Sequence, residues 1–192
     1  MLGVGVVLAV LCRSLAWAGP GRNRWSRGRR SATMGCMELV VLCGLQASGK
    51  STFRRAYFPN HEAVSKDLMG HAKRKEASQR RLIMAALQAG RDVIVDNTNP
   101  TVEDRSAIID IGRAHEARMV GYYFESVLAD CAARNADRET SQVVPEVGLL
   151  ATRSRLRVPT LDEGFDELWY VRIVDPAGLE VEPWNIETVA NE

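Results

Sequence analysis

At 192 residues the chain is long enough for one domain of ordinary size, and its 46% hydrophobic and 26% charged residues are typical of a soluble globular protein. The formal net charge of +1 excludes a globally basic surface, so any nucleic acid would have to bind at a local basic patch. The four cysteines have no CxxC spacing and no histidine partners, so neither a zinc site nor a disulfide framework is predicted. We therefore expect buried thiols in a reducing compartment and a cytoplasmic protein.

Residues 1–33 form an N-terminal extension that differs from the rest of the chain. They begin with an apolar run and carry six arginines but no acid, and Ala16-Trp17-Ala18 resembles a signal-peptide cleavage site. The apolar run is too short to span a bilayer. An export signal, a targeting arm and an upstream segment outside the functional protein all fit this pattern. We favour the last and expect the folded domain over residues 34–192.

The remaining sequence predicts strands that alternate with helices. Strands are expected at residues 38–43, 62–65, 91–96, 118–125 and 168–174. Helices are expected at residues 50–58, 68–89, 101–114, 127–137 and 146–157. Such alternation implies right-handed crossovers and a mostly parallel sheet covered on both faces, with ligands at the carboxyl ends of the strands. The predicted fold class is therefore α/β, a three-layer P-loop NTPase fold with a helical lid.

A complete phosphate-binding loop, G-x-x-x-x-G-K-[ST], joins the first predicted strand to the first predicted helix. It consists of Gly44, Leu45, Gln46, Ala47, Ser48, Gly49, Lys50 and Ser51, and Thr52 follows it. Glycines let the backbone N–H groups turn inward beside a helix N-terminus, which favours phosphate. ATP and Mg²⁺ are the expected cofactors, with Lys50 on the β- and γ-phosphates and Ser51 on the metal.

The loop alone does not distinguish kinases from GTPases or motor ATPases. The sequence contains no Asn/Thr-Lys-x-Asp guanine-specificity motif, and its size leaves little room for the extra domains of ATP-driven machines. These observations favour an ATP-dependent phosphotransferase.

Two carboxylates follow predicted strands and would face the loop. Asp67 comes just after the second strand, where it could accept the proton of an attacking hydroxyl or simply cap the next helix. Asp96 closes the third strand, where P-loop proteins place a carboxylate near Mg²⁺, although a turn residue would also fit. The amides and hydroxyl of Asn97, Thr98 and Asn99 are suited to binding an acceptor or to orienting this loop.

Arginines mark the predicted lid. Arg134 and Arg138 are four residues apart and would share one helix face, just before a segment that could close over the phosphates. Either one could neutralise charge during phosphoryl transfer or belong to a solvated surface.

Two short sequences resemble the kinase domain of the polynucleotide 5′-hydroxyl kinases, particularly the kinase half of the animal polynucleotide kinase 3′-phosphatases. They are Asp96-Asn97-Thr98-Asn99-Pro100 and Pro159-Thr160-Leu161-Asp162-Glu163-Gly164-Phe165, and the resemblance extends from about Leu39 to Trp169. It implies that ATP donates its γ-phosphate to a polynucleotide 5′-hydroxyl. It also implies that Asp67 is the general base, Arg138 the lid arginine and Asp96 the acid at the acceptor rim.

One departure from the family leaves the acceptor open. The phage-type enzymes have an arginine three residues after the base, whereas this chain has Gly70, so Lys66, Lys73 or Arg74 would have to bind the acceptor phosphate. A kinase for a small metabolite, of the gluconate-kinase or zeta-toxin type, shares the donor site and is the main alternative. A non-catalytic ATP-binding protein is the other. The sequence does not distinguish DNA from RNA.

Overall fold

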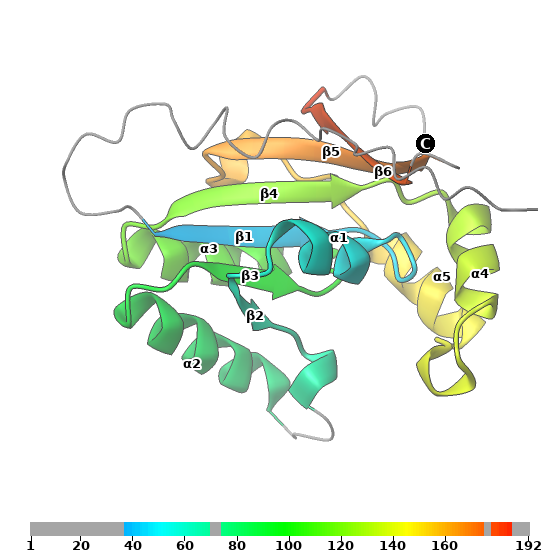
Figure 1. The fold of residues 1–192 in the computed structure, drawn as a ribbon, viewed down its shortest axis with the longest axis horizontal. Coiled ribbons are helices and arrows are strands. Elements are labelled where there is room, and N and C mark those ends of the chain that lie inside the picture. Colours follow the sequence, from blue (N-terminus) through cyan, green and yellow to red (C-terminus); the bar gives the residue numbers. More distant parts are fainter. Residues whose placement is uncertain (1–36, 70–73, 175–177, 186–192) are drawn as a thin grey trace, which may run out of the picture. The chain divides into compact units, whose positions relative to one another are not determined.

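A mostly parallel sheet forms the centre of the domain (Figure 1). The computed structural model describes residues 37–69, 74–174 and 178–185. The predicted extension over residues 1–33, Gly70 and Lys73 lie outside these ranges. Six strands in the described part of the chain follow the order β2-β3-β1-β4-β5-β6, and every pair is parallel except β5 with β6. The predicted α/β class with a mostly parallel sheet is confirmed.

Strands and helices alternate along the chain as far as β4, and two helices separate β4 from β5. The strands are β1 (Glu38–Cys43), β2 (Glu62–Val64), β3 (Val93–Asp96), β4 (Arg118–Phe124), β5 (Glu167–Val174) and β6 (Gly178–Pro183). The helices are α1 (Lys50–Tyr57), α2 (Lys75–Gln88), α3 (Val102–Ala114), α4 (Leu128–Ala136) and α5 (Glu146–Arg155). Short 3-10 turns lie at η1 (Asp67–Met69), η2 (Thr140–Gln142) and η3 (Leu161–Glu163).

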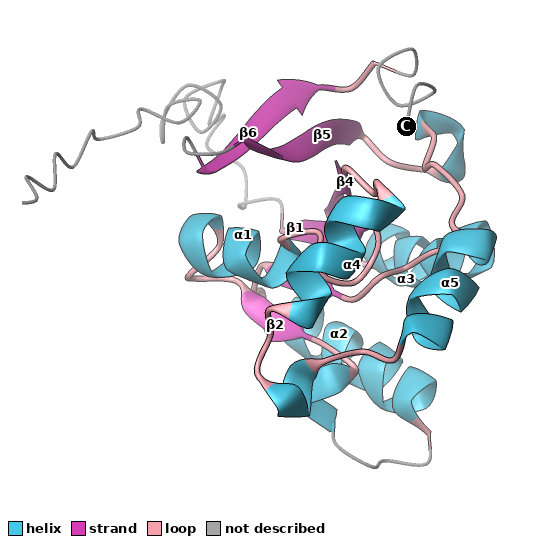
Figure 2. Ribbon diagram, turned by 90° about the vertical axis from the view of Figure 1, so that its right-hand side faces the viewer, coloured by secondary structure: helices cyan, strands magenta, loops and turns pink. Residues whose placement is uncertain are grey.

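Alternate residues of the central strand β1 point into two separate cores. Leu39, Val41 and Cys43 belong to a cluster that also contains residues of α2 and α3, whereas Val40 and Leu42 pack with Phe53 of α1. These five of the six β1 residues are fully buried, as expected for a parallel strand with helices on both faces. Figure 2 shows this layering, with α1 on one side of the sheet and α2 and α3 on the other.

Two expectations about the elements were wrong. The helix predicted over 68–89 begins only at Lys75, because Asp67–Met69 form a 3-10 turn in which the Met69 amide bonds to the Lys66 carbonyl. No element was predicted after residue 174, but β6 pairs antiparallel with β5. Its inward residues Leu179 and Val181 alternate with glutamates, a period-two signal that was present in the sequence.

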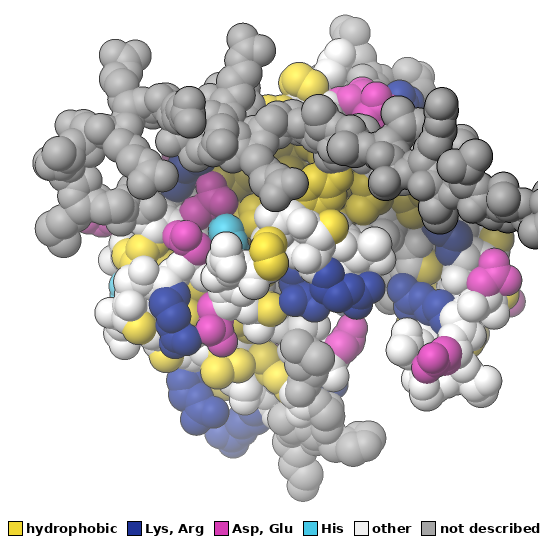
Figure 3. Space-filling view, in the orientation of Figure 1, with side chains coloured by type: hydrophobic (Ala, Val, Ile, Leu, Met, Phe, Trp, Pro, Cys, Tyr) yellow, Lys and Arg dark blue, Asp and Glu magenta, His cyan; other side chains and the backbone are white. Residues whose placement is uncertain are grey.

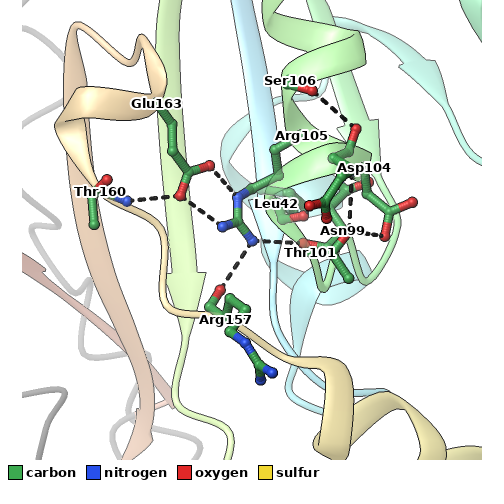
Figure 4. Close-up of polar contacts among 10 residues, drawn as sticks. Leu42, Asn99, Thr101, Asp104, Arg105, Ser106, Arg157, Thr160 and Glu163 are labelled. Carbon is green, nitrogen blue, oxygen red and sulfur yellow. Dashed lines mark hydrogen bonds and ion pairs between the residues drawn. The ribbon is translucent and has the colours of Figure 1, made fainter.

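A buried ion pair joins α3 to the segment that follows α5 (Figure 4). The Arg105 side chain is fully buried, and its Nε and Nη2 atoms donate to the two carboxylate oxygens of Glu163 at 2.6 and 2.7 Å. Its Nη1 donates to the backbone carbonyls of Asn99 and Arg157 at 3.1 and 3.0 Å. One guanidinium thus connects α3 and the loop before it to the segment over residues 157–163, which lies 52 to 58 positions further along the chain.

Glu163 is also tied into its own turn. It accepts a hydrogen bond from the Thr160 amide at 3.1 Å, and the two residues form a capping box around η3. Glu163 and Thr160 belong to the Pro159–Phe165 sequence that carries the family resemblance. The Pro159–Phe165 segment therefore holds Arg105, which in turn bonds to the Asn99 carbonyl in the loop that follows β3.

Glu163→Gln should lower the free energy of unfolding by about 3 kcal/mol, because it leaves the buried Arg105 charge without its partner. In a domain of this size the melting temperature should fall by roughly 10 °C. Urea and thermal unfolding of the full chain would measure both. Arg113 of α3, which pairs with Asp166 on the surface, is the matched control. Arg113→Met should cost less than about 1 kcal/mol, and equal losses from the two variants would contradict a special role for the buried pair.

Candidate active site

The predicted site residues gather where β1, β2 and β3 end. These strands are parallel and adjacent, and in their register Val64 pairs with Val95 and Leu42 with Asp96. The phosphate-binding loop after β1, the Asp67 segment (residues 65–69) after β2 and the segment after β3 therefore share one edge of the sheet. Figure 3, which views the molecule from the α1 side of the sheet, shows Lys and Arg side chains over α1 and beside α4.

Unusual backbone angles shape the phosphate-binding loop. Gly44 has a φ of +140°, and a Cβ atom there would lie 3.0 Å from the Phe124 carbonyl oxygen. Ala47 and Gly49 also have positive φ values, of 59° and 95°. Gly49 caps α1 without a side-chain hydrogen bond, so the first turn of α1 can offer its N–H groups to an anion.

Lys50 folds back into the loop. Its Nζ donates to the Gly44 carbonyl and to Ser48 Oγ, each at 3.1 Å, and also to the Leu45 carbonyl. The residue is 7% exposed, and burial lowers its pKa from 10.5 to about 8, while the charge of Asp96 opposes that shift. Lys50 is thus a desolvated cation surrounded by neutral oxygen atoms, an arrangement that favours the approach of a phosphate.

Asp96 is buried beside the loop and paired with an arginine that the sequence analysis overlooked. Its Oδ2 lies 3.1 Å from Nε of Arg54, and the Asp96 side chain is 7% exposed. Arg54 stands four residues after Lys50 on α1, a spacing that places the two cations on one helix face and could have identified it. Ser51 and Thr52, in the first turn of the same helix, are exposed.

Asp67 opens the η1 turn with its side chain exposed. Its backbone N–H donates to Ser65 Oγ at 3.3 Å. The preceding amide, of Lys66, donates to Asn97 Oδ1 at 2.8 Å. The position of Asp67 is therefore set from two sides, while its carboxylate faces solvent at the same sheet edge as the phosphate-binding loop.

The rim, defined as residues Asp96–Asn99, contacts a different element through each of its residues. Asp96 contacts α1, Asn97 contacts the Asp67 segment and α2, the Thr98 carbonyl accepts the Gly44 amide at 3.0 Å, and Asn99 Nδ2 donates to the Leu42 carbonyl at 2.7 Å. Asn99 is 3% exposed and has a φ of +41°. The rim thus links the donor loop to the segment that carries Asp67.

The lid, consisting of α4, η2 and α5, is fastened to the phosphate-binding loop at two points. Arg134 Nε donates to the Ala47 carbonyl at 2.9 Å, and Gln46 Nε2 donates to Thr152 Oγ1 at 2.9 Å. Arg134 therefore supports the loop. Arg138 is partly exposed, donates to the Gln142 carbonyl at 3.5 Å, and its charge contributes to the lowered pKa of Lys50.

A protein-family model and proteins of known structure are similar to this chain. A family model described as an AAA domain matches residues 39–159. The chain belongs to this AAA-domain family. The bifunctional polynucleotide phosphatase/kinase of Schizosaccharomyces pombe is 30% identical to this chain over 133 residues, covering 67% of this chain and 32% of that protein. The chain thus spans about a third of the length of this relative.

Solved structures share the fold of the AAA domain. Kti12 of Chaetomium thermophilum, in complex with ADP-AlF3, is 18% identical, with 71% of this chain and 90% of that chain covered and a TM-score of 0.56. A gluconokinase of Sinorhizobium meliloti is 16% identical, with 72% and 84% covered and a TM-score of 0.53. The predicted P-loop kinase fold and its resemblance to polynucleotide kinases are confirmed.

Within the described ranges, no helix combines the length and apolar character needed to cross a bilayer. The same residues contain no cluster of three or more His, Cys, Asp or Glu side chains that could hold a metal ion.

The buried position of Lys50 predicts a pH dependence of stability. Because its pKa in the folded state, about 8, lies below 10.5, the unfolded chain binds more protons between these values and stability should rise with pH. Between about pH 7 and about pH 10.5, the wild type should gain roughly 2–3 kcal/mol relative to Lys50→Met. Urea unfolding of both proteins across this range would measure the gain. A constant difference between them would show that Lys50 titrates normally.

Proposed function

We propose that the domain is an ATP-dependent kinase that transfers the γ-phosphate to the 5′-hydroxyl of a polynucleotide. The observation that carries this proposal is the placement of an exposed carboxylate, Asp67, at the same sheet edge as the phosphate-binding loop. A phosphate donor and a proton acceptor side by side are the two requirements of hydroxyl phosphorylation.

The donor half is the loop from Gly44 to Ser51, with Thr52. Its backbone N–H groups and the N-terminus of α1 would hold the phosphates of ATP, and Lys50 would turn from the loop carbonyls toward the β- and γ-phosphates. The Ser51 hydroxyl is exposed on the first turn of α1 and is a hard oxygen donor of the kind that Mg²⁺ prefers. When bound, Mg²⁺ would neutralise phosphate charge.

The acceptor half is Asp67 with the rim. As the 5′-hydroxyl oxygen forms a bond to the γ-phosphorus, the bond to the β–γ bridging oxygen breaks and ADP leaves. Asp67 accepts the hydroxyl proton. Asp96, held by Arg54, would lie beside the reacting groups at the rim, together with Thr98.

Arg138 would complete the site from the lid. It is partly exposed and near enough to affect the pKa of Lys50. Movement of the lid toward the loop would bring its guanidinium onto the phosphoryl group as negative charge develops there.

The 30% identity with a polynucleotide phosphatase/kinase supports a polynucleotide acceptor. Lys66, next to Asp67, and Arg74, which directly precedes α2, could contact the acceptor phosphate, although Lys66 also pairs with Glu76 at 3.3 Å. The alternative is a kinase that phosphorylates a small metabolite, and the fold shared with a gluconokinase is the observation that supports this alternative. An open basic groove would favour the first and a closed pocket the second.

The full chain should transfer label from γ-labelled ATP to a 5′-hydroxyl oligonucleotide in the presence of Mg²⁺. A 5′-phosphorylated oligonucleotide is the matched control, because it offers no acceptor hydroxyl at that end. A panel of sugars, including gluconate, tests the alternative acceptor. Transfer to a sugar but not to the oligonucleotide would overturn the polynucleotide assignment while leaving the kinase assignment intact.

Asp67→Asn should reduce kcat by roughly 10²- to 10⁴-fold, because the amide cannot accept the hydroxyl proton. The Kd for ATP should change little, since Asp67 does not belong to the phosphate-binding loop. Rapid-quench transfer assays and isothermal titration with ATP would measure the two quantities. An unchanged kcat would exclude Asp67 as the base.

Arg138→Ala should lower kcat by roughly 10²-fold through lost stabilisation of transition-state charge. Arg153, exposed on α5, is the lid control, and Arg153→Ala should keep near-wild-type kcat. Similar losses in both variants would indicate that lid charge in general, and not Arg138 in particular, supports the reaction.

A further inference from the structure

The Asn97 side chain is used at both ends within the protein. Its Oδ1 accepts the Lys66 amide at 2.8 Å, and its Nδ2 donates to Gln79 Oε1 at 2.9 Å. Gln79 is 5% exposed on α2, so it forms a fixed support for this amide. Asn97 was predicted to bind an acceptor or to orient this loop, and its hydrogen bonds lead to the backbone next to Asp67 and to Gln79.

Within the described residues, the Asp67 segment makes few other hydrogen bonds. Between β2 and α2 it leaves the sheet after Val64 and forms the η1 turn, in which the Met69 amide bonds to the Lys66 carbonyl at 3.3 Å. The Ser65 hydroxyl accepts the Asp67 amide at 3.3 Å. Among the hydrogen bonds of residues 65–67 in the described part of the chain, the bond from Lys66 to Asn97, at 2.8 Å, is the shortest and the one that reaches the rim.

The rim is in turn fastened to the donor side. Its next residue, Thr98, accepts the Gly44 amide at 3.0 Å at the start of the phosphate-binding loop. Consecutive rim residues thus hold the two halves of the site, one by a side chain and one by a carbonyl. Because Asn97 and Thr98 are joined by a single peptide bond, their two hydrogen bonds set the distance between the donor loop and the Asp67 segment.

We infer that Asn97, supported by Gln79, is a positioning residue that holds Asp67 at the correct distance from the phosphate donor. The inference rests on the proposed function, in which Asp67 accepts the acceptor proton. Loss of either hydrogen bond would let the Asp67 segment shift, and misplacement of a base by about 1 Å can cost roughly 10²-fold in rate. Asn97 acts through Asp67 and does not touch the reacting atoms.

Leucine is close to asparagine in shape but cannot form either hydrogen bond. Asn97→Leu should therefore lower kcat at least about 10-fold, while the KM for ATP and the KM for the acceptor stay near wild type. Gln79→Met should have the same effect, because it removes the support for the Asn97 amide. Gln88→Met is the matched control on the same helix, since Gln88 is exposed at the end of α2. Melting temperatures of all variants would show whether the fold is retained.

A double-variant cycle separates positioning from acceptor binding. If Asn97 acts through Asp67, then Asp67→Asn combined with Asn97→Leu should be no slower than Asp67→Asn alone, within about 3-fold. Multiplied losses in the double variant would overturn the inference. A raised KM for the acceptor with retained kcat would also overturn it and return Asn97 to acceptor binding.

Hydrogen exchange gives a readout that does not depend on activity. In Asn97→Leu, the amides of residues 65–69 should exchange faster, while those of the phosphate-binding loop remain as protected as in the wild type. Unchanged exchange at residues 65–69 would overturn the inference even if the variant is inactive. A wild-type chain that transfers phosphate to no acceptor would contradict the proposed function, and the exchange result would still decide whether Asn97 orders this segment.

Discussion

The buried pairing of Arg105 with Glu163 is the interaction on which the geometry of the site depends. A fully buried guanidinium requires that its N–H groups find acceptors, and here the acceptors come from the Pro159–Phe165 segment, from the Asn99 carbonyl and from the Arg157 carbonyl. The pair therefore fixes the end of the rim against the polypeptide that leaves the lid. Burial acts to lower the pKa of Arg105, but Glu163 and other neighbouring groups, among them Asp104, together raise this pKa above its ordinary value.

From that anchor, tight contacts extend through the rim to both halves of the candidate site. Asn99 bonds to β1, Thr98 to the start of the phosphate-binding loop, Asn97 to the Asp67 segment and Asp96 to α1. Four consecutive residues thus determine how the strand ends are spaced. Such a rigid rim suits a reaction in which most of the rate comes from positioning and electrostatics.

The lid stands in contrast, because its connections to the loop are few. Arg134 and Gln46 provide single hydrogen bonds, and the Oε1 atom of Gln46 is buried without a partner in the described structure. Asn135 ties α4 to the segment before α5 through the backbone of Val144. Opening of the lid would require these hydrogen bonds to break and would also expose Cys131 of α4, which is buried in the core.

The sequence by itself determined the fold class, the phosphate-binding loop and most strand and helix positions, because these depend on local periodicity and on glycines at fixed spacing. It identified Asp67, Asp96 and Arg138 as candidates, and their roles stay predictions. Only the tertiary structure revealed the partners of the rim, since the contacts from Asp96 to Arg54, from Asn97 to Gln79 and from Arg105 to Glu163 join residues 18 to 58 positions apart. Sequence periodicity carries no information about such pairings, which arise when parallel strands bring their ends to one edge.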